Sequence, residues 1–218
     1  MKKENIHLLG ASGHARVILD ILKSRKQPVG EIYDANPAIR ELQGHPVLPQ
    51  REMKFPLLIC IGDNYTRARL ANQLNGPFAS AVAASATISS SATISEGSVV
   101  MQGAIIQAGS RIGRHAIVNT VASVDHDCIV GDFVHISPHA ALCGNVTVGE
   151  GTHIGAGATV IQGVTIGKWC CVGAGAVVIH DVPDGATVVG VPAQEIHRNY
   201  PFPFPLHLNA ELQLSGAL

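Results

Sequence analysis

The sequence has few aromatic residues, little charge and no long apolar run, and each shortage excludes a class of protein. Aromatic residues make up 4% and charged residues 14% of its 218 residues, and the formal net charge is −1. This balance leaves no basic surface for nucleic acid and no polybasic membrane anchor. No stretch approaches the roughly 18 apolar residues of a membrane-spanning helix, and the first residues lack the apolar run of a signal peptide. We therefore expect a cytoplasmic protein that binds neither nucleic acid nor membranes.

The few cysteines lack the spacing of a metal site. The five cysteines are odd in number and lack the paired C-x-x-C spacing of a zinc site: Cys60, Cys128, Cys143, Cys170 and Cys171. We expect reduced thiols and no bound metal.

What the chain does have is a six-residue repeat. From Val82 to Val178 an aliphatic residue recurs at every sixth position, and all but Leu142 are β-branched. The positions are Val82, Ile88, Ile94, Val100, Ile106, Ile112, Val118, Val124, Val130, Ile136, Leu142, Val148, Ile154, Val160, Ile166, Val172 and Val178. Four residues after each, the side chain is small or slim, as at Ala86 and Ala104. Neither a helical period near 3.6 nor an alternation of two explains this spacing.

One aliphatic and one small inward residue in every six fit the flat face of a triangular prism. Three faces make a coil of about 18 residues, and coils stack at the parallel-strand spacing of about 4.8 Å. Such a solenoid needs several repeats before it buries a continuous core. We therefore predict a mainly β fold, with a parallel β-helix over 79–189 and an extension over 190–218.

Residues 1–78 lack the repeat and resemble a small Rossmann-like α/β unit. The predicted elements are strands at 6–10, 30–34 and 55–62 and helices at 15–25 and 66–74. Their alternation indicates a parallel sheet with any ligand at the carboxyl ends of its strands. The turn Gly10–His14 lacks the full G-x-G-x-x-G of a dinucleotide site. The backbone N–H groups of this turn still lie at the N-terminus of a predicted helix, where they could bind an anion. The alternative is an ordinary βα turn with no ligand.

The repeat and the glycine turn together resemble a known family. The repeat, with GVPA at 190–193, resembles the hexapeptide-repeat acyltransferases over about half of the chain. A β-α-β unit with a GASGHA turn before the β-helix resembles one branch, the bacillosamine-type nucleotide-linked 4-amino-sugar N-acetyltransferases and related sialic acid O-acetyltransferases. The resemblance implies a left-handed β-helix, a homotrimer with sites between neighbouring prisms, and acetyl-CoA as co-substrate. It also implies a nucleotide-activated amino sugar as acceptor.

The resemblance implies that the small domain holds the nucleotide of the sugar substrate. Matched position by position, Gly13 and His14 lie at the phosphate-side turn. Asp34 stands where the family has an acid that contacts the nucleotide part, and Gly62 and Asn64 fall in the third-strand loop on the same rim.

His126 has the most informative setting among the histidines of the repeat. It follows Val124 by two places, which predicts an outward corner position, and Asp125 and Asp127 flank it. A carboxylate partner orients an imidazole and raises its basicity, as a general base needs; a solvated surface histidine is the alternative. The stretch HDCIVGDFVHIS (126–137) resembles the family's catalytic segment, which implies His126 as the base and Asp127 as its partner, a role that Asp125 could share.

The 18-residue length of a coil identifies further candidate site residues, because residues 18 apart stack on the same corner. Gly144 follows His126 by 18 residues, so it stacks on the same corner and offers its N–H as an oxyanion donor. Ala156 and Ala174, also 18 apart, occupy one corner of successive coils, where small side chains would let the pantetheine arm of acetyl-CoA lie against the backbone. The family match implies an acetyl-CoA contact for these residues and for His135.

The cysteines do not indicate a covalent acyl-enzyme. Cys128 and Cys170 fall in the inward column of small residues, whereas Cys143 and Cys171 are expected at the surface with no base nearby in sequence. The predicted reaction is therefore direct attack of the amine on the thioester.

The resemblance therefore implies an acetyl-CoA-dependent N-acetyltransferase that acts on the 4-amino group of a nucleotide-linked 4-amino-4,6-dideoxysugar. A sialic acid O-acetyltransferase is the first alternative. A γ-type carbonic anhydrase is another, because His135 and His153 are 18 apart and could share a zinc ion with a ligand from a neighbouring subunit. A non-catalytic nucleotide-sugar-binding scaffold is a third. The choice between UDP, GDP and dTDP stays open, and the tail at 199–218 has no assignment.

Overall fold

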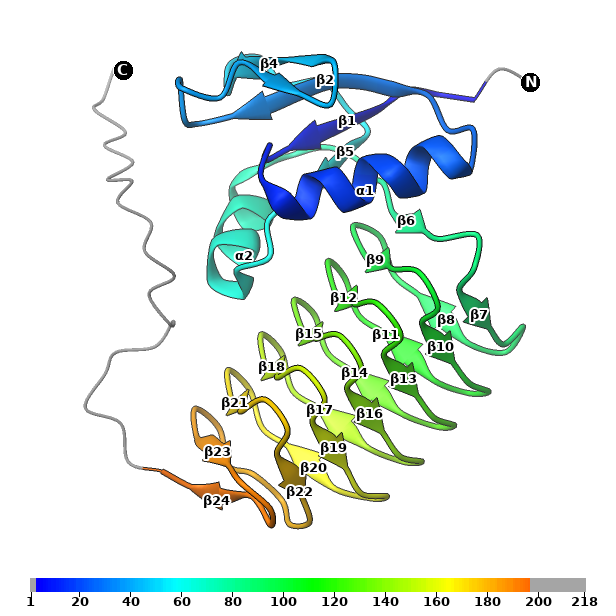
Figure 1. Cartoon of the computed structure of the whole chain (residues 1–218), viewed down its shortest axis with the longest axis vertical. Coiled ribbons are helices and arrows are strands. Elements are labelled where there is room, and N and C mark those ends of the chain that lie inside the picture. The colour runs from blue at the N-terminus through cyan, green and yellow to red at the C-terminus, as the bar shows by residue number, and fades with distance from the viewer. Residues whose placement is uncertain (1–2, 197–218) are drawn as a thin grey trace.

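The structure is a computed structural model that describes residues 3–196, in which a small α/β domain lies against one side of a long β-helix (Figure 1). The tail at 199–218 lies outside the described residues, as do 1–2 and 197–198. Within the described part no helix is long and apolar enough to cross a membrane.

The α/β domain is a five-stranded sheet with two helices. Its elements are β1 (Ile6–Leu9), α1 (Gly13–Ser24), β2 (Val29–Asp34), β3 (Glu41–Leu42), β4 (His45–Pro49), β5 (Leu57–Ile59) and α2 (Asn64–Gln73). The strand order is β3-β4-β2-β1-β5, parallel throughout except for β3. The sequence predicted β1, β2, β5 and both helices but missed the β3–β4 hairpin. β4 contains Pro46 and Pro49, which are tolerated because β4 lies near the sheet edge, with only β3 beyond it.

The parallel order brings three chain segments to one edge of this sheet. The turn after β1, the end of β2 at Asp34 and the loop after β5 all lie at the carboxyl ends of their strands. Gly10 begins the first turn with a φ of 105°, and a Cβ there would lie 3.1 Å from the carbonyl oxygen of Cys60. A larger residue would therefore push the β1 and β5 loops apart.

The repeat region is a parallel β-helix with three faces, as predicted. Face 1 is β6 (Ala81–Val82), β9 (Val99–Val100), β12 (Ile117–Val118), β15 (His135–Ile136), β18 (His153–Ile154), β21 (Cys171–Val172), β23 (Thr187–Val189) and β24 (Gln194–Glu195). Face 2 is β7 (Thr87–Ile88), β10 (Ile105–Ile106), β13 (Ser123–Val124), β16 (Ala141–Leu142), β19 (Thr159–Val160) and β22 (Val177–Val178). Face 3 is β8 (Thr93–Ile94), β11 (Arg111–Ile112), β14 (Ile129–Val130), β17 (Thr147–Val148) and β20 (Thr165–Ile166). All pairings are parallel except that of β24 with β23.

The register between coils is the predicted 18 residues. On face 1, Ile117 is paired with His135, and His135 with His153. Residues 18 apart therefore occupy the same place in successive coils, which is the geometry on which the predicted site depends.

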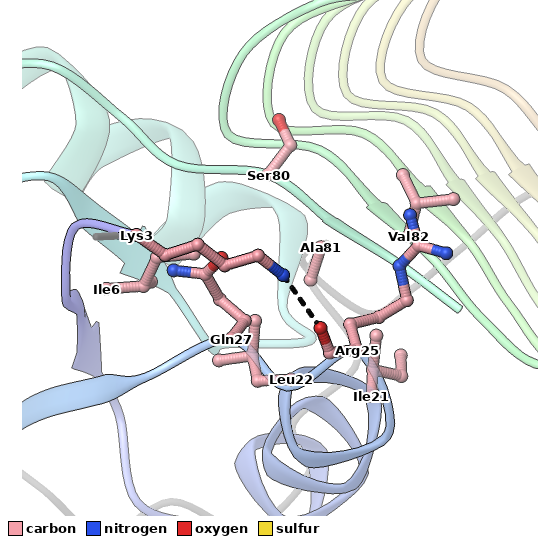
Figure 2. Close-up of a pocket in the computed structure, with 9 residues that line it drawn as sticks. All are labelled: Lys3, Ile6, Ile21, Leu22, Arg25, Gln27, Ser80, Ala81 and Val82. Carbon is pink, nitrogen blue, oxygen red and sulfur yellow. Dashed lines mark hydrogen bonds between the residues drawn. The ribbon is translucent and has the colours of Figure 1, made fainter. Parts of the chain in front are cut away.

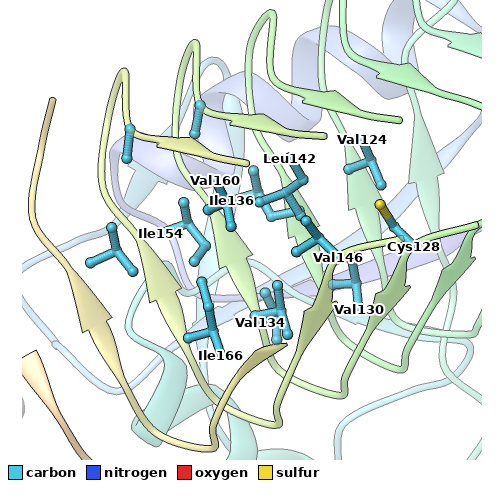
Figure 3. Packing of buried hydrophobic residues seen from close by; sticks show 14 of the residues in the cluster. Val124, Cys128, Val130, Val134, Ile136, Leu142, Val146, Ile154, Val160 and Ile166 are labelled. Carbon is cyan, nitrogen blue, oxygen red and sulfur yellow. The ribbon is translucent and has the colours of Figure 1, made fainter. Parts of the chain in front are cut away.

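The core of the prism consists of the aliphatic column and the column of small residues (Figure 3). Ile136 and Val160 are fully buried, and so are Cys128 and Cys170, as predicted for inward positions. The Cys128 thiol lies 3.1 Å from the carbonyl oxygen of Cys143, and burial raises its pKa. The expectation that Cys171 is exposed was wrong: it is 3% exposed on face 1, where His153 and Thr187 flank it.

The small domain docks on face 1 through α1 and α2 (Figure 1). Ile18 and Leu22 of α1 share one buried cluster with Val99 and Ile117, which point outward from face 1. Burial of an aliphatic side chain of this size contributes about 1.5–3 kcal/mol. The contact therefore fixes the sheet edge with Gly10 and Asp34 relative to the prism.

Candidate active site

His126 lies at the corner between faces 2 and 3, in the turn that joins β13 to β14, with its ring exposed. Its Nδ1 lies 2.9 Å from Oδ2 of Asp127, so the Nδ1–H donates a hydrogen bond to the carboxylate and Nε2 stays available to accept a proton. Asp127 occupies a left-handed turn position with a φ of 56°. On the other side, Asp125 accepts a hydrogen bond from the His126 N–H at 2.8 Å.

Both neighbouring carboxylates raise the pKa of His126 above its ordinary value. The hydrogen bond to Asp127 is the largest cause, and the charge of Asp125 is the second. A higher pKa makes the neutral imidazole a stronger base, and its Nε2 is the nitrogen that can take a proton from a reacting group. The His126–Asp127 pair therefore has the geometry of a general base and its partner.

Two glycines flank this pair in the neighbouring coils. A Cβ on Gly144 would lie 2.6 Å from Nε2 of His126, and a Cβ on Gly109 would collide with Oδ1 of Asp127. The N–H of Asn145 donates to the His126 carbonyl at 2.9 Å and keeps the two coils in register. The Gly144 N–H has no acceptor among residues 3–196, so it is available to a ligand at this corner.

The rim of the small domain carries Gly13 and Asp34. Gly13 begins α1, is exposed and has open space where a Cβ would be. The Asp34 carboxylate accepts hydrogen bonds from the N–H groups of Ala11 at 2.7 Å and Asn36 at 2.8 Å. Asp34 thus holds the turn after β1 against the end of β2, which leaves the first N–H groups of α1 facing outward.

His14, in the first turn of α1, points into the junction between the two domains. Its Nε2 is buried and has no hydrogen-bond partner among the described residues. Burial lowers the pKa of His14 to about 4, and the charge of Arg67 adds to the effect. At neutral pH the ring is uncharged, and the unpaired nitrogen is available to a ligand group beside the rim.

His135 lies on face 1 in the same junction. Its Nδ1 donates to the carbonyl oxygen of Gly62 at 3.3 Å, and its Nε2 accepts from the Asn119 side chain at 3.0 Å. Burial holds its pKa well below the ordinary value, with contributions from His153 and Arg67. The structure therefore brings Gly62 and His135 together, which the sequence had assigned to different ligands.

Asn64 is not on an open rim, contrary to its predicted place. Its side chain is 6% exposed, and its amide nitrogen donates to the carbonyl oxygens of Gly151 at 3.0 Å and Thr152 at 3.2 Å. Its Oδ1 accepts from Arg67 at 2.8 Å. These bonds use the whole amide, so Asn64 joins the small domain to the β-helix instead of facing a nucleotide. Sequence reasoning missed Arg67, because a basic residue in a helical pattern looks like a solvated one.

Ala156 and Ala174 are exposed at the corner between faces 1 and 2. Gly157 and Gly175, which follow them, have open space where a Cβ would be. The corner is thus a strip of small residues that an extended chain can lie against. It is also a different corner from that of His126, so one chain by itself does not bring these residues to the base.

Two groups of candidate residues therefore exist in one chain. The first, at the corner between faces 2 and 3, is the base group: His126, Asp127 and Gly144. The second lies over face 1 and its corner with face 2, and we call it the junction group: Gly13, His14, Asp34, Gly62, His135, Ala156 and Ala174.

The paired histidines of face 1 do not form a metal centre within the described chain. The rings of His135 and His153 are 4.9 Å apart between centroids, but Nε2 of His153 lies 3.1 Å from the Ser137 hydroxyl. Residues 3–196 contain no group of three or more histidine, cysteine, aspartate or glutamate residues that could hold a metal ion.

A pocket of about 260 Å³ lies elsewhere, at the carboxyl end of α1 (Figure 2). It is lined by Lys3, Ile6, Ile21, Leu22, Arg25, Gln27, Ser80, Ala81 and Val82. The first α1 residue that lines it is Ile21, so about 12 Å of helix separate this pocket from the rim at Gly13. It belongs to neither group of candidate residues.

Comparison with known proteins identifies both domains. The PglD N-terminal domain family matches residues 5–74, and the bacterial transferase hexapeptide family (six repeats) matches 127–162 and 145–180. The first match covers the small domain with the rim, and the second covers the coils that carry His135, Gly144 and Ala156.

Solved structures agree over nearly the whole chain. A histidine mutant of perosamine N-acetyltransferase from Caulobacter crescentus, in complex with CoA and GDP-perosamine, is 40% identical over 89% of this chain and 98% of its own, with a TM-score of 0.85. The acetyltransferase domain of PglB from Neisseria gonorrhoeae, in complex with acetyl coenzyme A, is 36% identical over 89% and 100%, with a TM-score of 0.82. WeeI from Acinetobacter baumannii is 27% identical over 88% and 99%, with a TM-score of 0.81.

These matches define an acyltransferase of the β-helix class. The chain belongs to the hexapeptide-repeat N-acetyltransferases that carry a PglD N-terminal domain.

Proposed function

We propose that this protein transfers an acetyl group from acetyl-CoA to the amine of a nucleotide-linked amino sugar, specifically the 4-amino group of a 4-amino-4,6-dideoxysugar. The observation that carries the proposal is the exposed His126–Asp127 pair, with Nε2 free above the Gly144 backbone, on a fold shared with an enzyme crystallised with CoA and GDP-perosamine. The buried, unpaired nitrogen of His14 beside the rim supports a ligand at the small domain.

In the proposed mechanism the sugar amine attacks the thioester carbonyl directly. Nε2 of His126 takes the amine proton as the new N–C bond forms, and Asp127 stabilises the imidazolium. The Gly144 N–H donates to the carbonyl oxygen as negative charge develops there. The S–C bond then breaks, and the thiolate leaves as CoA after it takes the proton back from His126. Cys128 and Cys170 have no part in it, because they are buried in the core.

The binding roles follow from the junction group. Gly13 and the first N–H groups of α1 receive the phosphates, and Asp34 orders that turn. His14 and the Gly62 loop face the sugar-nucleotide, while Ala156, Ala174 and His135 border the strip that suits the pantetheine arm. Asn64 has no binding role in this proposal, because its amide is fully used within the protein.

We propose a homotrimer in which the base group of one copy faces the junction group of the next. The support is that the two groups occupy different corners of the same prism, so a complete site needs a second copy. A cyclic trimer has head-to-tail interfaces that pair different surfaces in this way.

We also propose a cytoplasmic location and the division 1–78, 79–189 and 190–218. Cys60, Cys128, Cys143 and Cys170 are free thiols, which suits a reducing compartment. The division is supported by α2 ending at Gln73, β6 beginning at Ala81 and β23 ending at Val189.

The test is acetyl-CoA turnover, followed as released thiol, with a panel of UDP-, GDP- and dTDP-linked 4-amino-6-deoxysugars. We expect turnover with one of them and a loss of about 10²- to 10⁴-fold in His126→Ala, the usual contribution of a general base. His180→Ala, at the same type of corner, is the matched control and should keep full activity. Thiol release with sialic acids but with no amino sugar would contradict the proposed acceptor and favour a sialic acid O-acetyltransferase.

A further inference from the structure

A buried arginine joins the small domain to the β-helix. Arg67, on α2, is 1% exposed, and its guanidinium donates five hydrogen bonds. Three acceptors lie in its own domain and two on the β-helix: the carbonyl oxygens of Ile61 at 2.9 Å and Gly62 at 3.1 Å, Asn64 Oδ1 at 2.8 Å, and the carbonyl oxygens of His115 and Phe133 at 2.8 Å each. All five N–H donors of the planar guanidinium are thus used within the protein, and two of them bond to the β-helix.

The charge of this arginine is stabilised without an ion pair. No carboxylate among residues 3–196 lies within ion-pair distance of Arg67. Burial lowers its pKa to about 9, which leaves it protonated at neutral pH, where the five oxygens stabilise the charge. A buried cation is costly unless its hydrogen bonds are complete, and a lysine has neither enough donors nor the fork geometry to replace it.

The same arginine reaches the junction group through one shared atom. The carbonyl oxygen of Gly62 accepts from Arg67 and also from Nδ1 of His135 at 3.3 Å. Gly62 belongs to the rim loop after β5, and His135 belongs to face 1. Arg67 therefore helps to set the distance between the rim loop and face 1 at the shared Gly62 carbonyl oxygen.

We propose that Arg67 is a positioning residue for the acetyl transfer: it holds the Gly62 loop in register with face 1, so that the sugar amine is presented to the base at a fixed distance. This role rests on the proposed function. Its effect passes through Gly62 and His135, since Arg67 is 1% exposed and all five of its hydrogen bonds end on protein atoms.

The experiment compares Arg67→Met and Arg67→Lys with Arg69→Met, a control at a partly exposed position on the same helix. All are assayed well below their unfolding temperatures, with the folded fraction measured by circular dichroism. We expect kcat to fall about 10- to 100-fold in Arg67→Met, as for a displaced substrate, and less in Arg67→Lys. The Kd of the matching nucleoside diphosphate should stay close to that of the wild type, because Arg67 makes no hydrogen bond to the turn after β1 that is proposed to receive the phosphates. Arg69→Met should match the wild type in both.

Hydrogen exchange gives a second readout that needs no substrate. Backbone amides in 61–64 and 133–136 should exchange faster in Arg67→Met than in Arg69→Met. Unchanged kcat in folded Arg67→Met, or a loss that only follows the folded fraction, overturns the positioning role. If the wild type acetylates no amino sugar, the proposed function fails and the catalytic role fails with it. The exchange rates then still decide whether Arg67 fixes the loop.

Discussion

The imidazole of His126 has a raised pKa because two carboxylates stand beside it in the chain, Asp127 bonded to Nδ1 and Asp125 nearby. A base must be unprotonated to act, so kcat/KM should fall as the pH drops through this raised pKa. Asp127→Asn removes the larger cause, so the acidic limb of the pH profile should move to lower pH. The plateau should also fall, by about tenfold or more, because the ring becomes a weaker base.

Asp125→Asn is the matched comparison for this pH profile. It removes the smaller cause, so the acidic limb should move in the same direction by less, with the plateau largely kept. An acidic limb that stays in place or moves to higher pH in Asp127→Asn would remove the pairing from the mechanism.

At the scale of elements, α2 determines how the small domain meets the prism, and its start depends on one cap. The Asp63 carboxylate accepts a hydrogen bond from the Thr66 N–H at 2.7 Å. Loss of such a cap costs about 0.5–2 kcal/mol, so Asp63→Ala should lower the unfolding temperature by about 2–4 °C per kcal/mol for a protein of this size. Calorimetry checks the shift. Asp63→Asn keeps a capping oxygen and should lose little, and equal losses in the two variants would exclude the cap as the cause.

The packing of the β-helix was the most predictable element. The aliphatic residue at every sixth position determines which side chains face inward, and stacking of coils then follows from backbone pairing alone. The buried Cys128 and the exposed His126, two residues apart, were both placed correctly from this count. The six-residue repeat carries no information about what covers the outside of a face. For this reason Cys171 was expected at the surface but is buried.

At the scale of the whole molecule, the separation of the base group from the junction group predicts sites shared between copies. Co-expression of His126→Ala with His14→Ala should yield mixed trimers in which some interfaces pair an intact base with an intact rim. Random mixing should restore about one quarter of the wild-type sites. A site needs His126 from one copy and His14 from the next, and each of these residues is intact in half of the chains. Thiol release measures the recovery, and each variant expressed alone is the control. A site contained in one chain would give no recovery beyond the two controls.

The mass of the assembly tests the same arrangement. Three chains of 22.8 kDa should sediment together at about 68 kDa. A monomer in which turnover persists would exclude shared sites.

Local spacing by itself determined the coils, the inward columns, the stacking of Gly144 on His126 and the parallel sheet with its ligand edge. Each of these depends on residues close in sequence or separated by a constant 18 positions. Only the tertiary structure decided which face the small domain covers, that Asn64 is buried, and that Arg67 links the two domains. The acceptors of Arg67 on the β-helix lie 48 and 66 residues away, and those of Asn64 lie 87 and 88 away. No periodic pattern links the two domains, because these bonds form only where the surface of the small domain meets that of the β-helix.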